Sequence, residues 1–124
     1  MDSLSPNIFV KDIHETIAFY QKIGFSLTMT VPEEGNYVWA MMHCGNVTFM
    51  FQSFESLADE LPEISRLPGS SLLFYIKIKD IRDFFDSIKL KATVLKGLEK
   101  TFYGATEFSI KDNNGYVLTF AEDK

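Results

Sequence analysis

Strand-like and helix-like hydrophobic periods follow one another at the start of the chain. Residues 5–10 are typical of a strand, and apolar residues then recur at helical spacing at Ile13, Ile17, Tyr20 and Ile23. Asp12 stands where a cap is expected, with Glu15 three residues on, and Gly24 stands where such a helix usually ends. The pattern predicts a strand followed by one short amphipathic helix.

Three further strands complete this first pattern. Residues 25–31 predict one strand, and residues 37–43 and 47–52 predict a hairpin about Cys44-Gly45-Asn46. The following segment, 54–68, is rich in Glu and Asp and is interrupted by Pro62. We expect it to form one or two short acidic helices that act as a linker.

The same order of strands and helix is predicted a second time in the rest of the chain. Its predicted elements are strands at 72–78, 92–98, 105–111 and 117–122, and a helix capped by Asp80 that carries Ile81, Phe84, Phe85 and Ile88. Asn114-Gly115 lies between the last two strands and favours a tight hairpin with positive φ at both residues.

The two patterns are copies at a nearly fixed offset, because Asp12 and Asp80 lie 68 positions apart and Gly45 and Gly115 lie 70 apart. We therefore predict one domain, 1–124, built of two β-α-β-β-β modules at about 4–53 and 71–123 and joined by the acidic linker. Duplicated units of this kind favour a ligand site between the copies.

The amino-acid composition reduces the number of possible functions. Twelve Phe residues predict an aromatic core, with an aromatic-lined pocket as the alternative. A net charge of −5 without a concentrated basic patch argues against nucleic acid as a partner. No apolar run of about 18 residues is present, so no membrane span is expected, and the first residues lack a signal-peptide pattern. Cys44 is the single cysteine, which favours the cytoplasm.

Two segments carry a family resemblance. They are Val10-Lys11-Asp12 ahead of Phe19-Tyr20, and Tyr103-Gly104 followed by Glu107-Phe108 and the turn Asp112-Asn113-Asn114-Gly115. With these motifs the chain resembles the vicinal oxygen chelate superfamily, which includes glyoxalase I, extradiol dioxygenases and bleomycin resistance proteins. The family commonly has Pro where Asn113 stands. The resemblance implies an α+β fold in which two βαβββ modules form a curved mixed sheet, a cup for the ligand, usually in a homodimer.

Enzymes of that superfamily hold a divalent metal, and the resemblance places their ligand positions at Ser5, Met50, Leu73 and Thr119. A catalytic metal needs about three His, Asp, Glu or Cys ligands, and none of the four residues is of that kind. The two histidines, His14 and His43, do not restore a ligand set. We therefore expect no metal and no other cofactor.

Strand alternation and the resemblance together predict what lines the cup instead. The expected ligand-binding residues are mainly apolar or neutral: Tyr37, Trp39, Met50, Gln52, Leu73, Tyr75 and Thr119. Glu107 is the one candidate inward charge, and it would suit a cationic ligand. The alternatives are that these side chains fill the cup or pack a dimer, and that Glu107 faces water or pairs with a lysine.

The leading hypothesis is a dimeric protein of the bleomycin-resistance type that sequesters a partly aromatic or cationic small molecule without chemistry. The first alternative is a lyase, isomerase or oxygenase of the same fold. It would use a metal held elsewhere or the acid–base groups Tyr75, Glu107 and His43. The second alternative is a module for protein association with no open pocket. One fold hosts many functions, so the fold does not separate these hypotheses.

Overall fold

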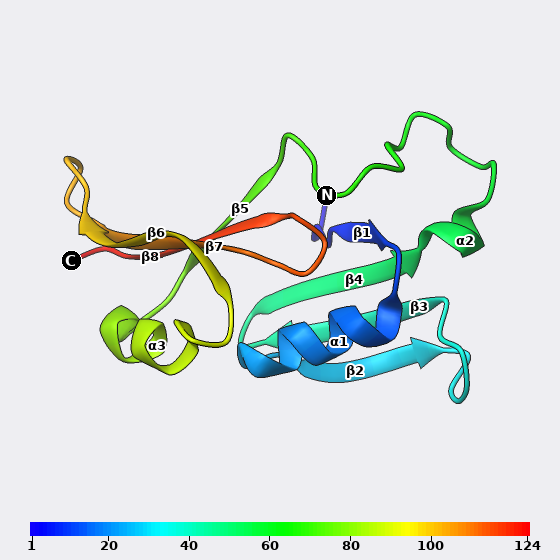
Figure 1. Cartoon of the computed structure of the whole chain (residues 1–124), viewed down its shortest axis with the longest axis horizontal. Helices are drawn as coiled ribbons and strands as arrows, with labels where there is room; N and C mark the ends of the chain where they lie inside the picture. The colour runs from blue at the N-terminus through cyan, green and yellow to red at the C-terminus, as the bar shows by residue number, and fades with distance from the viewer. The chain divides into compact units, whose positions relative to one another are not determined.

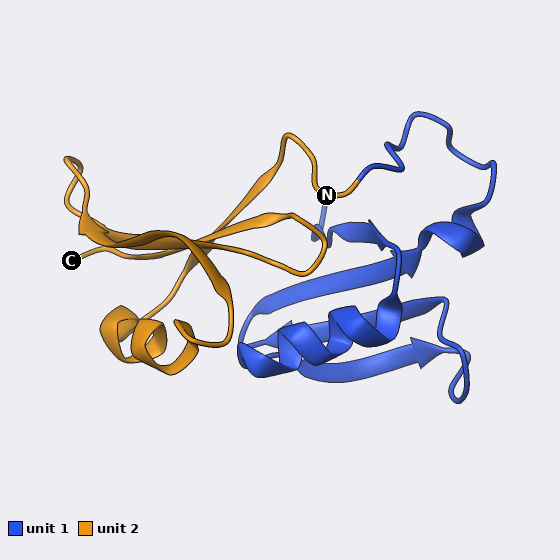
Figure 2. Cartoon of the chain, viewed as in Figure 1, with its two compact units in different colours: residues 1–67 blue, residues 68–124 orange.

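A computed structural model describes residues 1–124 and shows eight strands and three short helices (Figure 1). The chain divides into two compact units, residues 1–67 and 68–124 (Figure 2). Each unit has one four-stranded mixed sheet and the predicted β-α-β-β-β order. The sequence prediction that both modules form a single domain stays a prediction.

Unit 1 contains one sheet with strand order β1-β4-β3-β2. Strands β1 and β4 are parallel, and the other neighbours are antiparallel. Its elements are β1 (Asn7–Val10), α1 (Ile13–Lys22), β2 (Ser26–Val31), β3 (Trp39–Cys44), β4 (Val47–Ser53) and α2 (Phe54–Leu57). These bounds agree with the predicted ones to within two residues at most ends, and β1 is two residues shorter than predicted.

Helix α1 lies along one face of this sheet, and its predicted cap is confirmed (Figure 1). The Asp12 carboxylate accepts a hydrogen bond from the Glu15 backbone N–H at 3.0 Å, which satisfies a free donor of the first turn. Tyr20 of α1 is fully buried against the sheet, with its ring 4.9 Å from that of Phe51 and 5.8 Å from that of Phe49. The alternate β4 side chains therefore belong to the other, helix-free face.

The linker contains one short helix, α2, and then an irregular segment held by Arg66. The Arg66 guanidinium donates hydrogen bonds to the carbonyl oxygens of Ala58, Glu60, Leu61 and Ile64 at 2.5–2.9 Å. A single planar donor group thus satisfies four backbone acceptors that have no helix to join.

Unit 2 repeats the arrangement with strand order β5-β8-β7-β6. Strands β5 and β8 are parallel, and the remaining pairs are antiparallel. Its elements are β5 (Leu73–Lys77), α3 (Ile81–Ile88), β6 (Thr93–Lys100), β7 (Thr106–Lys111) and β8 (Val117–Glu122). Strand β8 has the bounds that the hydrophobic alternation predicted.

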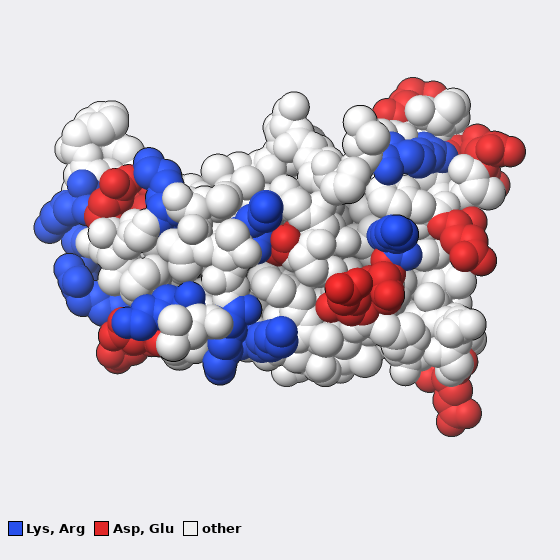
Figure 3. Space-filling view, viewed as in Figure 1, with Lys and Arg blue, Asp and Glu red and all other residues white.

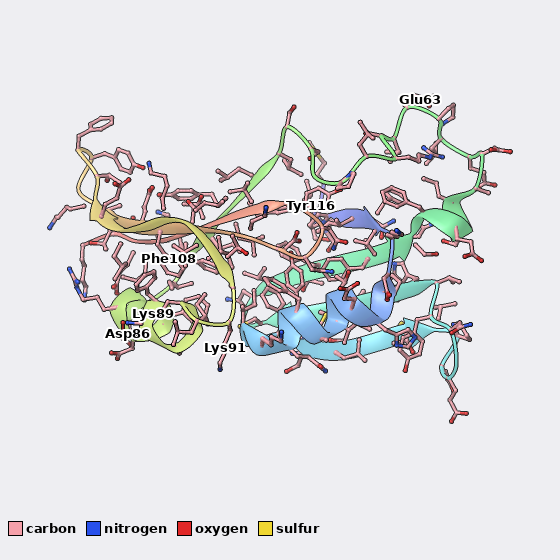
Figure 4. The ribbon with its side chains drawn as sticks, in the orientation of Figure 1. Glu63, Asp86, Lys89, Lys91, Phe108 and Tyr116 are labelled. Carbon is pink, nitrogen blue, oxygen red and sulfur yellow. The ribbon has the colours of Figure 1, made fainter.

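Aromatic side chains form the core between α3 and this sheet. Phe108 of β7 lies on the side of the sheet that faces α3 (Figure 4), with its ring 4.9 Å from that of Phe85 and 5.2 Å from that of Phe120. Phe84 joins this group, with its ring 4.9 Å from Phe120. The prediction that phenylalanine mainly fills the core is therefore confirmed for both units.

The start of α3 corrects one prediction. Asp80 does not cap the helix with its side chain, because its backbone is left-handed, with φ at +56°. The Glu122 carboxylate at the end of β8 takes this place, accepting hydrogen bonds from the N–H groups of Asp80 at 3.1 Å and Ile81 at 3.3 Å. A residue 42 positions away in sequence therefore caps the second helix, whereas a local residue caps the first.

The turn between β7 and β8 also differs from the sequence prediction. Among its residues only Gly115 has positive φ, and the connection spans residues 112–116 rather than a two-residue Asn-Gly loop. The Asp112 carboxylate shapes it by accepting hydrogen bonds from the N–H groups of Asn114 and Tyr116, both at 2.8 Å. An Asx-type bond therefore replaces the expected hairpin geometry. None of the three helices is long and apolar enough to cross a membrane.

Candidate functional site

In unit 1 the sheet face opposite α1, called here open face 1, carries aromatic and thioether side chains. By strand register Trp39 of β3 lies beside Gln52 of β4, and Met41 lies beside Met50. Each of these four side chains is half-buried in the unit. Three of the predicted ligand-binding residues, Trp39, Met50 and Gln52, are therefore neighbours on one face.

Asn7 adds the polar part of open face 1. It pairs with Met50 in the parallel register, and its amide donates a hydrogen bond to Gln52 Oε1 at 3.0 Å. The Asn7 Oδ1 atom is buried and has no hydrogen-bond partner. A buried acceptor without a partner is uncommon in folded proteins.

Tyr37 lies apart from these residues. Its ring stacks on the imidazole of His14 from α1, with ring centroids 4.6 Å apart. It also borders a groove of about 680 Å³ along the edge strand β2. His43 lies at the end of β3, where its Nδ1 is 2.5 Å from the Thr28 hydroxyl. The ring partner that the structure gives Tyr37 is therefore His14.

In unit 2 the sheet face opposite α3, called here open face 2, is mainly polar. Leu73 and Tyr75 of β5 point away from the core and are 50% and 47% exposed. Thr119 of β8 lies beside Tyr75 but is only 5% exposed, and its hydroxyl is 2.8 Å from that of Ser109. Leu73 and Tyr75 are thus accessible to a ligand within the unit, whereas Thr119 is held by a neighbouring strand.

Glu107 is the centre of a hydrogen-bonded cluster on open face 2. The hydroxyls of Tyr75 and Tyr103 both donate to the same carboxylate oxygen, Oε2, with a distance of 2.6 Å from Tyr103. Glu99 of β6 lies opposite Glu107 in the strand register, and it pairs with Lys96 at 3.0 Å. Glu107 therefore has two phenols as its partners, where the sequence analysis had left open a lysine.

The cluster changes how the tyrosines titrate. The hydrogen bond to Glu107 is the largest cause that raises the pKa of Tyr75 above its ordinary value, followed by partial burial and the carboxylate charge. The same causes in the same order raise the pKa of Tyr103. Loss of either phenol proton would remove a hydrogen bond and place two negative charges together. Both phenols therefore remain donors at neutral pH.

The metal implied by the family resemblance does not fit these residues. The register corrects two of the expected positions: Asn7 and not Ser5 lies beside Met50, and Tyr75 and not Leu73 lies beside Thr119. These four residues supply only an amide, a thioether, a phenol and a hydroxyl. These neutral groups are poor ligands for the divalent ions that such sites hold. No group of three or more His, Cys, Asp or Glu side chains elsewhere is arranged to hold a metal ion.

Two members of these faces were missed by the sequence analysis. Asn7 alternates with the buried Ile8 and Val10, so the period of two already placed it on the open face. Tyr103 precedes β7 in a loop, where alternation gives no direction. Its contact with Glu107 depends on the turn at residues 101–105, which is closed by a hydrogen bond from the Thr101 N–H to the Ala105 carbonyl at 2.8 Å.

Solved structures with the same fold cover nearly the whole chain. TioX from Micromonospora sp. ML1 is 16% identical over 100% of both chains, with a TM-score of 0.80. A glyoxalase/bleomycin resistance protein/dioxygenase family enzyme from Burkholderia phytofirmans PsJN is 22% identical over 97% of both chains, with a TM-score of 0.77. A bleomycin-binding protein complexed with bleomycin is 19% identical over 100% of both chains, with a TM-score of 0.69. At these identities the likeness shows the fold.

Sequence comparison confirms the resemblance noted above. A search of curated protein sequences found no match to the chain. The family model for the Glyoxalase/Bleomycin resistance protein/Dioxygenase superfamily matches residues 3–120, which is nearly all of the 124. The chain therefore belongs to the glyoxalase/bleomycin resistance protein/dioxygenase superfamily.

Proposed function

We propose that the chain binds a small, partly aromatic or cationic molecule and sequesters it without a metal and without chemistry, as proteins of the bleomycin-resistance type do. The observation that carries this proposal is the composition of open face 1, where Trp39, Met41 and Met50 are only half-buried. A binding site for a small molecule is usually concave and mainly apolar with a few fixed polar groups, and open face 1 has that composition.

The side chains of open face 1 suit an aromatic ligand for physical reasons. An indole ring offers a large flat surface for stacking, and thioethers make favourable contacts with ring edges. The linked amides of Asn7 and Gln52 are the few polar groups beside them. These features support an occupant with a ring system and a few polar groups.

Glu107 supports the cationic part of the proposal. Its carboxylate is held by Tyr75 and Tyr103, so the charge is fixed in place among phenol rings. A cation gains both ion pairing and contact with ring faces in such surroundings. The bleomycin-binding neighbour is consistent with this choice, at the level of fold only.

Two further parts of the proposal follow from the superfamily and the composition. We infer that the protein acts as a homodimer and that it works in the cytoplasm. Cys44, the single cysteine, is consistent with that compartment. Sedimentation equilibrium of the purified chain tests the dimer, and a monomer at micromolar concentration would contradict it.

The single tryptophan provides the test of binding. Titration with a panel of aromatic and cationic small molecules is expected to change Trp39 fluorescence and to give matching isotherms in calorimetry. Trp39→Ala should weaken binding about tenfold or more, the size seen for a central aromatic contact. Leu67→Ala removes an exposed apolar side chain of the same unit outside the sheet and should leave the affinity unchanged. Failure of every panel member to bind would overturn the proposal.

Metal content separates the proposal from an enzyme of the same fold. Elemental analysis of the purified protein should find no divalent ion in stoichiometric amount, because the donors beside Met50 and Thr119 are neutral. A stoichiometric ion would favour the metal-dependent alternative. Conversion of a bound panel member to a product would favour a metal-free enzyme.

A further inference from the structure

The two oxygens of the Glu107 carboxylate are in different states, and this difference bears on the kind of cation that the proposed function would select. The hydroxyls of Tyr75 and Tyr103 both donate to Oε2. A carboxylate oxygen has two lone pairs in its plane, so two donors occupy Oε2 fully. No hydrogen bond from the chain reaches Oε1. Glu107 therefore offers one free oxygen to a ligand, and not two.

The charges around Glu107 leave it available to a cation. Lys96, whose charge interacts with that of Glu107, pairs with Glu99 at 3.0 Å, and Glu99 lies opposite Glu107 in the register. The three side chains carry one positive and two negative charges, so the group has a net charge of −1. The excess negative charge favours a cationic ligand over an anionic one.

Two tyrosine rings adjoin the Glu107 carboxylate through the hydroxyls that donate to Oε2. Tyr75 and Tyr103 are 47% and 58% exposed, so the core does not enclose either residue. The Phe102 ring packs edge-on against Tyr103, with centroids 5.0 Å apart. Rings beside a carboxylate stabilise a compact cation that is partly removed from water.

We propose that Glu107 Oε1, the oxygen left free when the phenols of Tyr75 and Tyr103 bind Oε2, is a subsite for a protonated amine, and that it prefers an ammonium group to a guanidinium. An ammonium is a compact charge that needs one acceptor oxygen. A guanidinium pairs best through two parallel hydrogen bonds to both oxygens of a carboxylate. The phenol donors on Oε2 block that arrangement. The subsite rests on the proposed function and names the ligand class for it.

The test uses three ligands that share one ring system: 1-naphthylmethylamine, 1-naphthylmethylguanidine and 1-naphthalenemethanol. Calorimetry with the full chain at pH 7 should give the tightest binding for the amine. It should exceed the alcohol by about fivefold, the size of a partly exposed ion pair. Glu107→Gln should bring the amine to the affinity of the alcohol. Asp86→Asn removes an exposed charge of α3 and should leave all three affinities unchanged.

The double substitution Tyr75→Phe with Tyr103→Phe tests the role of the phenols. It frees Oε2 and keeps both rings, so the guanidine should gain on the amine until the preference is lost or reversed. An unchanged preference in this variant, or a guanidine that already equals the amine in the wild type, would overturn the inference.

The inference and the proposed function fail in different ways. Equal binding of the alcohol and the amine that is sensitive to Trp39→Ala and insensitive to Glu107→Gln would overturn the ammonium subsite and leave the proposed function standing. Absence of binding by all three naphthyl compounds would overturn the subsite, and the wider panel would then decide the function.

Discussion

The two units have equivalent covered faces and different open faces. Under each helix the sheet presents large apolar side chains, such as Phe51 in unit 1 and Phe120 in unit 2. On the open faces, equivalent register positions carry Asn7 and Tyr75, Trp39 and Glu107, Met41 and Ser109, and Met50 and Thr119. The covered faces are thus alike in the two units. At the positions of Trp39, Met41 and Met50, by contrast, the open face is apolar in unit 1 and polar in unit 2.

The two units also differ in net charge. Unit 1 has nine Asp and Glu residues against three Lys and Arg, whereas unit 2 has eight against nine. Figure 3 shows acidic side chains gathered over unit 1 and basic ones over unit 2 on the visible face. The negative charge of the chain therefore comes from unit 1. The cation preference proposed for Glu107 is accordingly local, because its own unit has almost no net charge.

The largest expected effect tests whether the covered faces are equivalent. Phe51→Ala and Phe120→Ala each remove a ring that is almost fully buried in an aromatic cluster. Each should lower the free energy of unfolding by about 3–5 kcal/mol, since a cavity replaces the ring. Denaturation by urea, followed by circular dichroism, measures both. A loss below about 1 kcal/mol in one variant would show that the two cores are not equivalent.

The helix caps give the next largest effect and separate the units. Asp12→Ala and Glu122→Ala each remove the carboxylate that caps a helix and should cost about 1 kcal/mol. Asp80→Gly should change stability by less than about 0.5 kcal/mol, because Asp80 makes no side-chain cap and glycine tolerates its positive φ. The same urea titrations measure all three. A cost for Asp80→Gly equal to that of Asp12→Ala would contradict the difference between the caps.

Sequence patterns predicted those parts of the fold that depend on near neighbours. Alternation gave the bounds of β8, and the Asp12 cap was correct because its acceptor and donor lie three residues apart. Asp80 stands at the equivalent position, yet its cap was wrong. Its backbone is left-handed and a residue on another strand takes its place, and no local pattern contains that information.

In the candidate site, too, the sequence predicted only the residues that lie inside regular strands. Period-two alternation grouped Trp39, Met50 and Gln52 correctly, because all three lie inside regular strands. Tyr37 lies outside β3, where alternation no longer holds, and it stacks on His14 instead. The partners of Glu107 were beyond reach, since Tyr103 comes from a loop and Tyr75 from a strand 32 residues earlier.

Substitutions on the open faces should have small effects on stability. Leu73→Ala removes a side chain that is half exposed and should change the free energy of unfolding by less than about 0.5 kcal/mol. Ile76 lies on the opposite face of the same strand and is 8% exposed, and Ile76→Ala should cost about 2 kcal/mol or more. Urea denaturation of the pair measures the contrast between the two faces of β5. Equal losses would mean that Leu73 belongs to a packed surface, as the association alternative requires.

The smallest expected effect is on the titration of the two tyrosines of open face 2. The pKa values of Tyr75 and Tyr103 are raised chiefly by their hydrogen bonds to Glu107, so the folded state favours the protonated phenols. The stability that these bonds contribute is therefore complete below the unfolded pKa of about 10 and is lost as pH rises through the folded values. Glu107→Gln should lower both pKa values, which absorbance at 295 nm during an alkaline titration measures. Asp86→Asn should leave that titration unchanged, because Asp86 pairs with Lys89 on α3. If both variants titrated like the wild type, the phenols would not be coupled to Glu107, and the polar character of open face 2 would need another cause.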